Sequence, residues 1–384
     1  MRQVKNTKQT QLDRNWPRSR QQNLKVAVVH DSYLYLGGAE RVLESMLELF
    51  PLADVYIPLI GQPYLDKLQQ KHRVYTSPLN LILPPEKYVS WLKPLVLMYW
   101  AGLNLGKYDL VISSSHSFSA KSVKVNPPTK HLAYLHTSPR YLYREFNEMS
   151  WLKKAPFKWF FSGVLGWLRK KDFEAAQQVD VLIANSKTTQ ARIKRYYHRS
   201  SQVIHPPVHL PVNQPRRANR PSYYLFHSRL VKQKGAALVI KAFNQLSKPL
   251  VVIGTGPEEK YLRKMAGKNI TFLGFVLDEQ LAQVYLKAKA LVYASIDEDL
   301  GLVPVEAMAH GVPVIAYNSG GVKETVVHNK TGLLFRQFSL KSLKKAVLKF
   351  EKRRWSAKNC HQQAQKFAEE KFQQQLLTVV LSLI

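Results

Sequence analysis

The segment SIDEDLGLVPVEAMAHGVPVI, residues 295–315, contains the pattern that decides the fold. An apolar run at 290–294 predicts a buried strand that ends near Ser295, and Pro304 is well placed in the first turn of a following helix. A second apolar run, 313–316, predicts the next strand. A strand, a helix and another strand in this order indicate a βαβ unit of a parallel sheet.

The same alternation extends in both directions from this segment. Apolar runs separated by helical stretches occur at 25–29, 54–59, 108–115, 131–136, 179–186, 223–228, 250–254, 270–274, 290–294, 313–316 and 332–335. A proline-rich stretch at 206–221 interrupts them and has no helical or strand period, which is typical of a linker. We therefore predict an α/β protein with two Rossmann-like, doubly wound domains at 23–205 and 222–350, followed by helices at 351–384 that pack back on the N-terminal domain.

Composition restricts the cellular compartment and the classes of binding partner. The single cysteine, Cys360, excludes an internal disulfide and fits a cytosolic protein. No apolar run reaches the roughly 18–20 residues that a membrane-spanning helix needs. The net charge of +31 attracts polyanions, which include nucleic acid, anionic lipid and phosphorylated substrates. Residues 1–22 are basic and poor in apolar residues, so we expect a disordered tail that is either a membrane tether or merely solvated.

Two glutamates carry the chemistry of the opening segment. Glu298 follows the predicted strand on a loop, and Glu306 lies eight positions later, near the start of the helix. Paired carboxylates accept hydrogen bonds from the vicinal hydroxyls of sugars and riboses. The helix N-terminus beside them offers N–H groups and positive potential to phosphate. A bare pair of glutamates near a helix start would more often cap the helix or lie in solvent.

The wider pattern, E-x7-E followed by A-M-A-x-G-x-P-V-I, resembles that of glycosyltransferase family 4, the large retaining family with the GT-B fold. Four other segments match the family in the expected order: HDSYLYLGGAER (30–41), YLHTSPRY (134–141), SRLVKQK (228–234) and GTGP (254–257), with Gly274-Phe275 after them. The second of these segments is similar to one in a mannosyltransferase-like branch. The resemblance implies two domains facing a central cleft and a GDP- or UDP-linked sugar donor, with no metal and no other cofactor.

The resemblance also implies roles for particular residues. Glu298 would contact the transferred sugar and Glu306 the nucleotide ribose, while His136 would line the reactive face of the sugar. Arg229 and Lys234 would neutralise the leaving diphosphate, a task that suits two cations placed after a strand. The predicted catalytic residues are His136, Glu298, Arg229 and Lys234. The predicted donor-binding residues are Gly37, Gly38, Arg229, Lys234, Gly254, Gly301, Leu302, Val303 and Glu306, with backbone contacts from Gly320 and Gly321. The predicted acceptor-side residues are Glu40, Arg140 and Tyr141.

The sequence departs from the family beside the predicted sugar pocket. The family often has E-G-F-G where this chain has Glu298-Asp299-Leu300-Gly301. Asp299 adds bulk and negative charge next to the sugar. We therefore expect the departure to affect which sugar is transferred rather than the type of reaction. The branch resemblance gives mannose as the best guess for the sugar.

An aromatic and basic segment at 151–171 suggests where the acceptor is found. Trp and Phe interleaved with Lys and Arg suit a helix at a membrane interface, although a core helix with a basic outer face would have a similar composition. We predict a cytoplasmic enzyme, peripheral on the inner face of the cell membrane, that acts on a lipid-linked or polysaccharide acceptor. The alternatives are a nucleotide-sugar epimerase of similar fold and a basic nucleic-acid-binding protein, but the chain has no recognised nucleic-acid motif.

Overall fold

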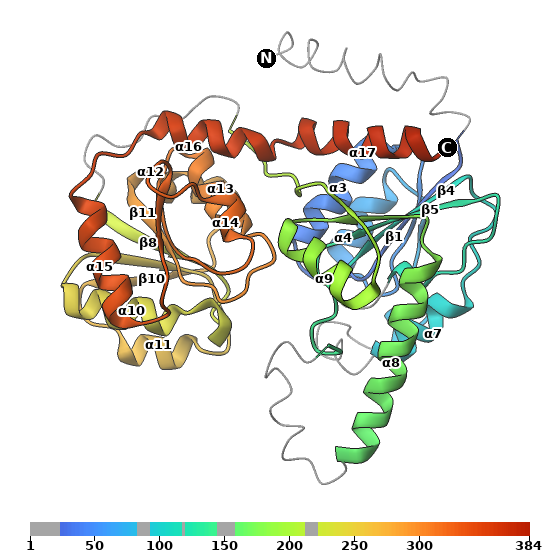
Figure 1. The fold of residues 1–384 in the computed structure, drawn as a ribbon, viewed down its shortest axis with the longest axis horizontal. Coiled ribbons are helices and arrows are strands. Elements are labelled where there is room, and N and C mark those ends of the chain that lie inside the picture. The colour runs from blue at the N-terminus through green and yellow to red at the C-terminus, as the bar shows by residue number, and fades with distance from the viewer. Residues whose placement is uncertain (1–23, 83–92, 117–119, 144–157, 212–221) are drawn as a thin grey trace. The chain divides into compact units, whose positions relative to one another are not determined.

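The computed structural model describes residues 24–82, 93–116, 120–143, 158–211 and 222–384, which form two compact units (Figure 1). The N-terminal unit consists of residues up to Pro207 together with Phe372–Ile384, and the C-terminal unit is Val208–Lys371. The predicted tail at 1–22, most of the predicted linker and residues 151–157 of the aromatic segment lie outside the described residues.

The N-terminal unit is built on a seven-stranded sheet with the order β3-β2-β1-β4-β5-β6-β7, and every pairing in it is parallel. The strands are β1 (Val26–His30), β2 (Asp54–Tyr56), β3 (Val74–Tyr75), β4 (Leu110–Ser115), β5 (Lys130–Leu135), β6 (Val181–Ala184) and β7 (Gln202–Val203). The helices are α3 (Gly38–Leu49), α4 (Gln62–Gln69), α5 (Leu79–Ile82), α7 (Lys93–Gly102), α8 (Lys158–Gln178) and α9 (Lys187–Tyr197).

Both faces of this sheet are covered, which explains why β1 is apolar from Val26 to Val29. Val26 and Val28 pack in the core that contains α3, whereas Ala27 and Val29 pack on the opposite face with Trp100 of α7. The C-terminal helix α17 (Glu369–Leu383) adds Phe372, Leu376, Leu377, Val379 and Val380 to the core on the α3 side.

The C-terminal unit has a six-stranded parallel sheet with the order β10-β9-β8-β11-β12-β13. The strands are β8 (Tyr223–His227), β9 (Leu250–Ile253), β10 (Ile270–Gly274), β11 (Ala288–Tyr293), β12 (Val314–Tyr317) and β13 (Gly332–Phe335). The helices are α10 (Ala236–Leu246), α11 (Glu259–Met265), α12 (Asp278–Lys287), α13 (Leu302–Ala309), α14 (Val322–Thr325), α15 (Leu340–Glu351) and α16 (Ala357–Ala364).

Alternate residues of the central strand β8 again enter two cores. Phe226 packs with α10 and α15, and Leu225 packs with α13 on the other face. The chain therefore forms doubly wound α/β layers in both units, which confirms the predicted fold class. In each sheet the strand order reverses next to the first strand, between β1 and β4 and between β8 and β11. Ligands of doubly wound sheets bind at the carboxyl ends of strands beside such a reversal.

Two expectations need adjustment. The short strands β3 and β7 were not predicted, because two residues carry too little pattern to identify a strand. The strand expected at 290–294 is observed as β11, which begins two residues earlier, at Ala288, and ends at Tyr293. Among the described helices, none is both long enough and apolar enough to cross a membrane.

Candidate active site

The two glutamates of the opening segment lie where the sequence places them, on a loop and on a helix. We call residues 295–301, between β11 and α13, the acidic loop. Glu298 lies in this loop and Glu306 in the second turn of α13, and both are half-buried. Gly301 is the N-cap of α13 and has a φ of 86°, a conformation that glycine adopts without a steric penalty.

Glu298 is held by an ion pair and a hydroxyl. Its Oε2 lies 2.5 Å from the Lys234 Nζ and accepts a hydrogen bond of 2.5 Å from the Ser295 hydroxyl. Lys234 ends a short 3-10 helix, Lys232–Lys234, that follows β8. Because β8 and β11 are neighbours in the sheet, their carboxyl ends bring these two side chains together across 64 positions of sequence.

The surroundings keep the Glu298 carboxylate ionised. Burial raises the pKa of Glu298, but the Lys234 ammonium and the hydrogen bonds that the carboxylate accepts lower the pKa further than burial raises it. The pKa therefore lies below its ordinary value, and the group is an anion at neutral pH. An ionised carboxylate is the acceptor that sugar hydroxyls need.

Two glycines support the acidic loop from the start of α14. The Gly321 N–H donates a hydrogen bond of 2.7 Å to the Glu298 carbonyl oxygen. A Cβ built on Gly320, which has a φ of 60°, would lie 2.1 Å from the same oxygen. The backbone of Glu298 is therefore packed so closely that no larger residue fits at Gly320. Both glycines were predicted to contact the donor, and the structure gives them this supporting role.

Arg229 and Gly254 lie on two loops that pack together at the ends of β8 and β9. A Cβ on Gly254 would lie 2.0 Å from the Ser228 carbonyl oxygen, and the Leu230 N–H donates to the Thr255 carbonyl oxygen at 2.8 Å. Arg229 itself is exposed. Among the described residues, no hydrogen bond or ion pair joins Arg229 to Glu298, so only Lys234 of the predicted cation pair contacts the acidic loop.

The N-terminus of α13 fits an anion. Its N-cap, Gly301, has no side chain that could cap the helix, and the first turn contains no acidic residue. Leu302 and Val303, the first two helical residues, are half-buried. Since the first N–H groups of a helix have no intrahelical acceptor, a phosphate is a suitable partner for them.

In the N-terminal unit, Gly37 and Gly38 begin α3 directly after the loop that follows β1. Gly37 is the N-cap, and its N–H donates to the Glu40 Oε2 at 3.0 Å. Neither glycine has a positive φ. A strained turn therefore does not explain the glycine pair; at Gly37 a Cβ would lie 2.9 Å from the Glu40 Oε2, so a side chain there would press on this carboxylate.

His136 is buried at the end of β5 and is neutral. Its Nε2 and the Nδ1 of His30 both share a hydrogen bond with the Ser114 hydroxyl, at 2.8 and 2.9 Å. Burial lowers the pKa of His136 well below its ordinary value, and the nearby His116 and His30 lower it further. Because Nε2 is occupied by Ser114, the neutral ring has Nδ1 left for a substrate.

Three residues form a cluster beside His136, and one of them was predicted from the sequence as a site residue. His30, Glu40 and His116 each offer one ligand atom, and these atoms lie within 4.8 Å of one another. His30 Nε2 is buried, has no hydrogen-bond partner among the described residues and lies 3.9 Å from the Glu40 Oε1. Among the described residues, this is the group whose side chains could together hold a metal ion. Only Glu40 was predicted; the signal for the others was their position at the ends of β1 and β4.

The last two predicted residues, Arg140 and Tyr141, lie in the turn after His136 and are half-buried. Burial raises the pKa of Tyr141, and the carboxylates of Asp172 and Asp31 raise it further, so its hydroxyl is a neutral donor. Both residues stay predictions as acceptor contacts.

Comparison with known proteins identifies two family models along the chain. Residues 36–211 match the model described as Glycosyltransferase Family 4, and residues 212–367 match the model described as Glycosyl transferases group 1. The two matches are adjacent and together include every described strand except β1.

Curated relatives are similar over parts of the chain. A stretch of 124 residues is 41% identical to a GDP-mannose-dependent alpha-(1-6)-phosphatidylinositol monomannoside mannosyltransferase of Mycobacterium tuberculosis, covering 28% of this chain and 32% of that protein. A stretch of 282 residues is 23% identical to an alpha-1,3/1,6-mannosyltransferase of Rhizomucor pusillus, covering 59% of this chain and 60% of that protein. The chain thus spans about a third of the length of the first of these relatives.

Solved structures share the fold over nearly the whole chain. Sucrose-phosphate synthase of Thermosynechococcus elongatus has a TM-score of 0.70 at 20% identity and covers 94% of this chain and 99% of its own. The Anabaena protein HepE, solved with UDP and glucose, has a TM-score of 0.65 at 21% identity and covers 94% and 100%. At these identities the likeness establishes the fold, which is GT-B.

Proposed function

The chain belongs to glycosyltransferase family 4, and from that premise we propose that it transfers a hexose from a nucleotide-diphosphate sugar to a hydroxyl group, with retention of configuration at the anomeric carbon. The observation that carries this proposal is the Glu298 carboxylate. It is kept ionised at a strand end by Lys234 and Ser295, within a loop that leads into an uncapped helix N-terminus.

Each part of the donor would bind to the protein groups that suit its chemistry. The Glu298 carboxylate accepts hydrogen bonds from hydroxyls of the transferred sugar, and Glu306 accepts them from the ribose one helical turn further on. The N–H groups of Gly301, Leu302 and Val303 face the diphosphate. Lys234 then changes partner, since its ammonium neutralises the charge that builds up on the diphosphate as the glycosidic bond breaks.

In the reaction, the bond between the anomeric carbon and the diphosphate oxygen breaks, and a bond to the acceptor oxygen forms on the same face of the sugar. The leaving phosphate takes the proton of the acceptor hydroxyl, so no protein base is required. A neutral His136 suits this route because it offers a hydrogen bond to the sugar without competing for that proton. Glu40, Arg140 and Tyr141 would contact the acceptor.

Mannose is the first candidate for the sugar, and a lipid-linked or polysaccharide molecule at a membrane is the first candidate for the acceptor. Two relatives that the chain resembles are mannosyltransferases, and one of them acts on a phosphatidylinositol mannoside. Helix α8 supports the membrane setting, because Trp167 is 52% exposed and is followed by the exposed cations Lys170 and Lys171. We propose a peripheral position at the inner face of the membrane.

Incubation of the purified chain with GDP-mannose, GDP-glucose, UDP-glucose and UDP-N-acetylglucosamine tests the proposal. We expect one donor to release its nucleoside diphosphate, and NMR of the product to show the anomeric configuration of the donor. Inversion would exclude the front-face route. Conversion of one free or nucleotide-linked sugar into its epimer, without transfer, would indicate the epimerase instead.

A further inference from the structure

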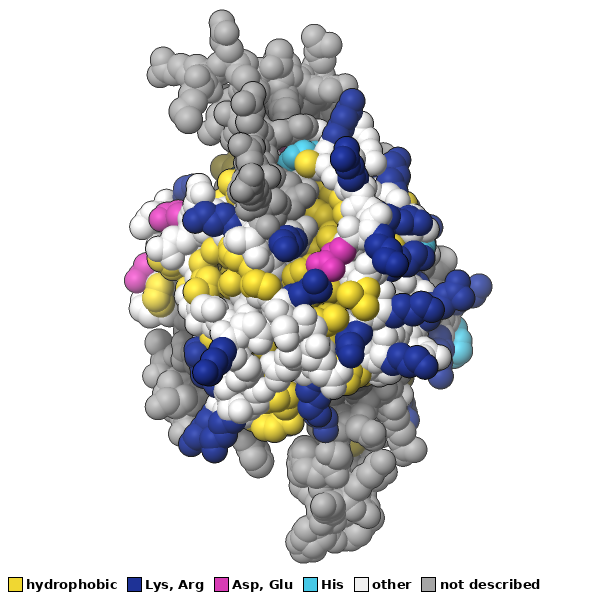
Figure 2. Space-filling model, turned by 90° about the vertical axis from the view of Figure 1, so that its left-hand side faces the viewer, with side chains coloured by type: hydrophobic (Ala, Val, Ile, Leu, Met, Phe, Trp, Pro, Cys, Tyr) yellow, Lys and Arg dark blue, Asp and Glu magenta, His cyan; other side chains and the backbone are white. Residues whose placement is uncertain are grey.

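Helix α15 carries an unusual concentration of lysine on its outer side. Its inner residues, among them Leu343, Val347 and Phe350, pack in the core of the C-terminal unit. Most of the outer positions are lysines, and we call Lys341, Lys344, Lys345, Lys349 and Lys352 the α15 lysine face. Figure 2, which views the molecule from the side where α15 lies, shows many Lys and Arg side chains and few Asp or Glu.

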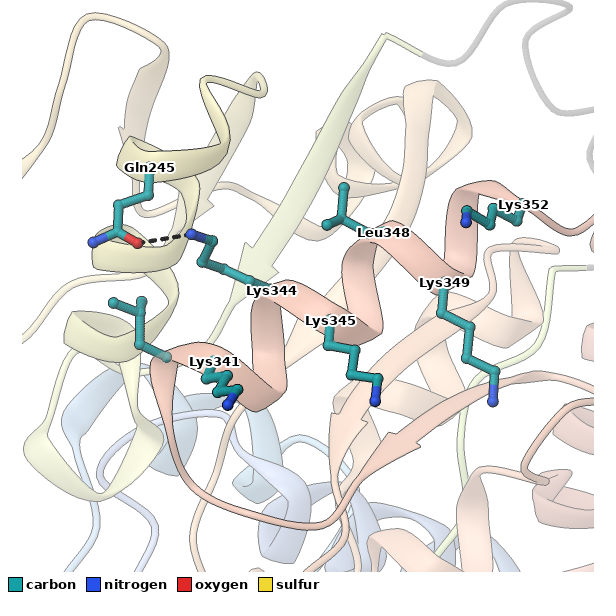
Figure 3. A pocket seen from close by; sticks show the side chains of 8 residues that line it. Gln245, Lys341, Lys344, Lys345, Leu348, Lys349 and Lys352 are labelled. Atoms are coloured by element: carbon teal, nitrogen blue, oxygen red, sulfur yellow. Dashed lines mark hydrogen bonds between the residues drawn. The ribbon is translucent and has the colours of Figure 1, made fainter.

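The arrangement of these lysines is regular. Figure 3 shows Lys341, Lys345 and Lys349 along one edge of the exposed face of the helix, at intervals of four residues, with Lys344, Leu348 and Lys352 along the other edge of the same face. Lys344 turns toward α10 and donates a hydrogen bond of 2.9 Å to the Gln245 Oε1. Together they line an open hollow of about 680 Å³ on the surface of the unit.

The protein does not compensate the charge of this face. Among the described residues, no carboxylate forms an ion pair with any lysine of the α15 lysine face. Glu351, the acidic residue of α15, is engaged by the Lys248 Nζ at 2.9 Å and by the Tyr224 hydroxyl at 3.0 Å. Two arginines add positive charge near Lys349. The pKa of His328 is lowered first by burial and then by the positive charges of Lys349, Arg353 and Arg336.

The spacing of these lysines does not stabilise the folded helix. Like charges four positions apart on a helix repel each other and destabilise it. Lysine stems, however, can lie along apolar material while their ammonium groups stay hydrated. One apolar side chain that lines the hollow, Leu348, is 47% exposed. A row of ammonium groups with an exposed leucine beside it is complementary to anionic headgroups above acyl chains.

We propose that the α15 lysine face docks the C-terminal unit on an anionic phospholipid membrane. This extends the membrane-associated acceptor of the proposed function, but it rests on the charge and exposure of α15 rather than on the reaction. The face is less suited to nucleic acid. Trp355, which follows α15 in the sequence, is stacked on Phe350 at 4.9 Å and donates its Nε1–H to the Phe350 carbonyl oxygen, so one face of its ring is already covered and its indole N–H is already used.

Vesicle co-sedimentation of the full chain, without donor or acceptor, tests this docking. We expect binding to phosphatidylcholine vesicles that contain phosphatidylglycerol, little binding to phosphatidylcholine alone, and loss of binding as salt is raised. Each lysine near an anionic surface contributes a factor of about five in affinity. The triple variant K341Q/K345Q/K349Q should therefore bind about 100-fold more weakly, since three such factors are removed.

The matched control is K260Q/K264Q/K268Q, which removes the same charge from exposed lysines on and beside α11 in the same unit. We expect it to lose much less affinity. The proposal is overturned if both triple variants lose vesicle affinity equally, since net charge would then suffice. It is also overturned if the α15 variant binds vesicles normally but loses binding to RNA. Release of nucleoside diphosphate in solution should be unchanged in the α15 variant, so failure of docking and failure of the proposed glycosyl transfer can be told apart.

Discussion

The paired glutamates should respond differently to substitution, and the Lys234–Glu298 ion pair makes the difference measurable. In Glu298→Gln the side chain keeps its shape but releases Lys234, whose ammonium then becomes available to a diphosphate. The two side chains are 25% and 21% exposed, so water still reaches the pair, and about 1 kcal/mol, the upper end of the range for solvent-accessible pairs, is a reasonable value for the interaction. Nucleoside diphosphate should therefore bind as tightly as to the wild type, or up to about five-fold more tightly.

Turnover should fall in the same variant, because Glu298 contacts the sugar in the transition state. A loss of about 100-fold or more in kcat is the usual size for removal of one such contact. Glu306→Ala removes a charged hydrogen bond to the ribose, worth about 1.5–3 kcal/mol, and should weaken nucleotide binding by about 10- to 150-fold. Calorimetry with GDP and UDP gives the affinities, and release of the diphosphate gives the turnover.

The exposed Glu279 on α12 provides a matched control, since Glu279→Gln makes the same chemical change away from the acidic loop. This variant should leave the nucleotide affinity and the turnover unchanged. Equal losses of nucleotide affinity in the Glu298 and Glu306 variants would refute the division of roles. So would a large loss of nucleotide affinity in Glu298→Gln, since it would mean that the carboxylate itself supports the nucleotide.

Three further predictions concern stability. Gly320→Ala should lower the free energy of unfolding, measured by urea titration, by about 1–3 kcal/mol, because the new Cβ would lie 2.1 Å from a carbonyl oxygen of the acidic loop. The control Gly166→Ala places its Cβ where no atom lies within 4 Å, and it should not destabilise the chain. Lys121→Met leaves the carboxylate of Asp172 buried without its cation and should cost about 3–5 kcal/mol by the same titration; a loss below 1 kcal/mol would contradict this. Burial lowers the pKa of His131 to about 4, below its ordinary value when unfolded, so the stability that its neutral form contributes is present above about pH 6.5 and is lost as pH falls toward 4. His131 alone should contribute about 2 kcal/mol to the loss of unfolding free energy between pH 7 and pH 5, and His131→Gln should reduce the measured loss by about that amount.

Much of the fold was accessible from the sequence because both sheets are parallel and covered on both faces. Strands such as β1 are then continuous apolar runs, and the helices between them are amphipathic. The edge strands β3 and β7 have two residues each and leave no such pattern. The chain also passes between the units twice, at Pro207–Val208 and again within α17 at Lys371–Phe372. The second passage lies inside a continuous helix, where composition gives no signal.

The candidate site was accessible only in part, for a related reason. Glu298 and Glu306 belong to one segment, so their spacing could be seen along the chain. The contact of Glu298 with Lys234 and the packing of Gly320 against its backbone depend on neighbouring strands. The link from His136 through Ser114 to His30 likewise joins the ends of three strands. Such contacts follow from the sheet order, which the pattern of apolar runs does not specify.

The most direct test of the central claim is to locate the donor on the protein by hydrogen–deuterium exchange, with and without the nucleotide sugar that supports turnover. The account predicts slower exchange in residues 228–235 and 295–306, and unchanged exchange in α15, where no donor group is expected. Protection of those two segments would place the donor at the Glu298 and Glu306 pair. Protection confined to other parts of the C-terminal unit, with these segments unaffected at saturating donor, would contradict it.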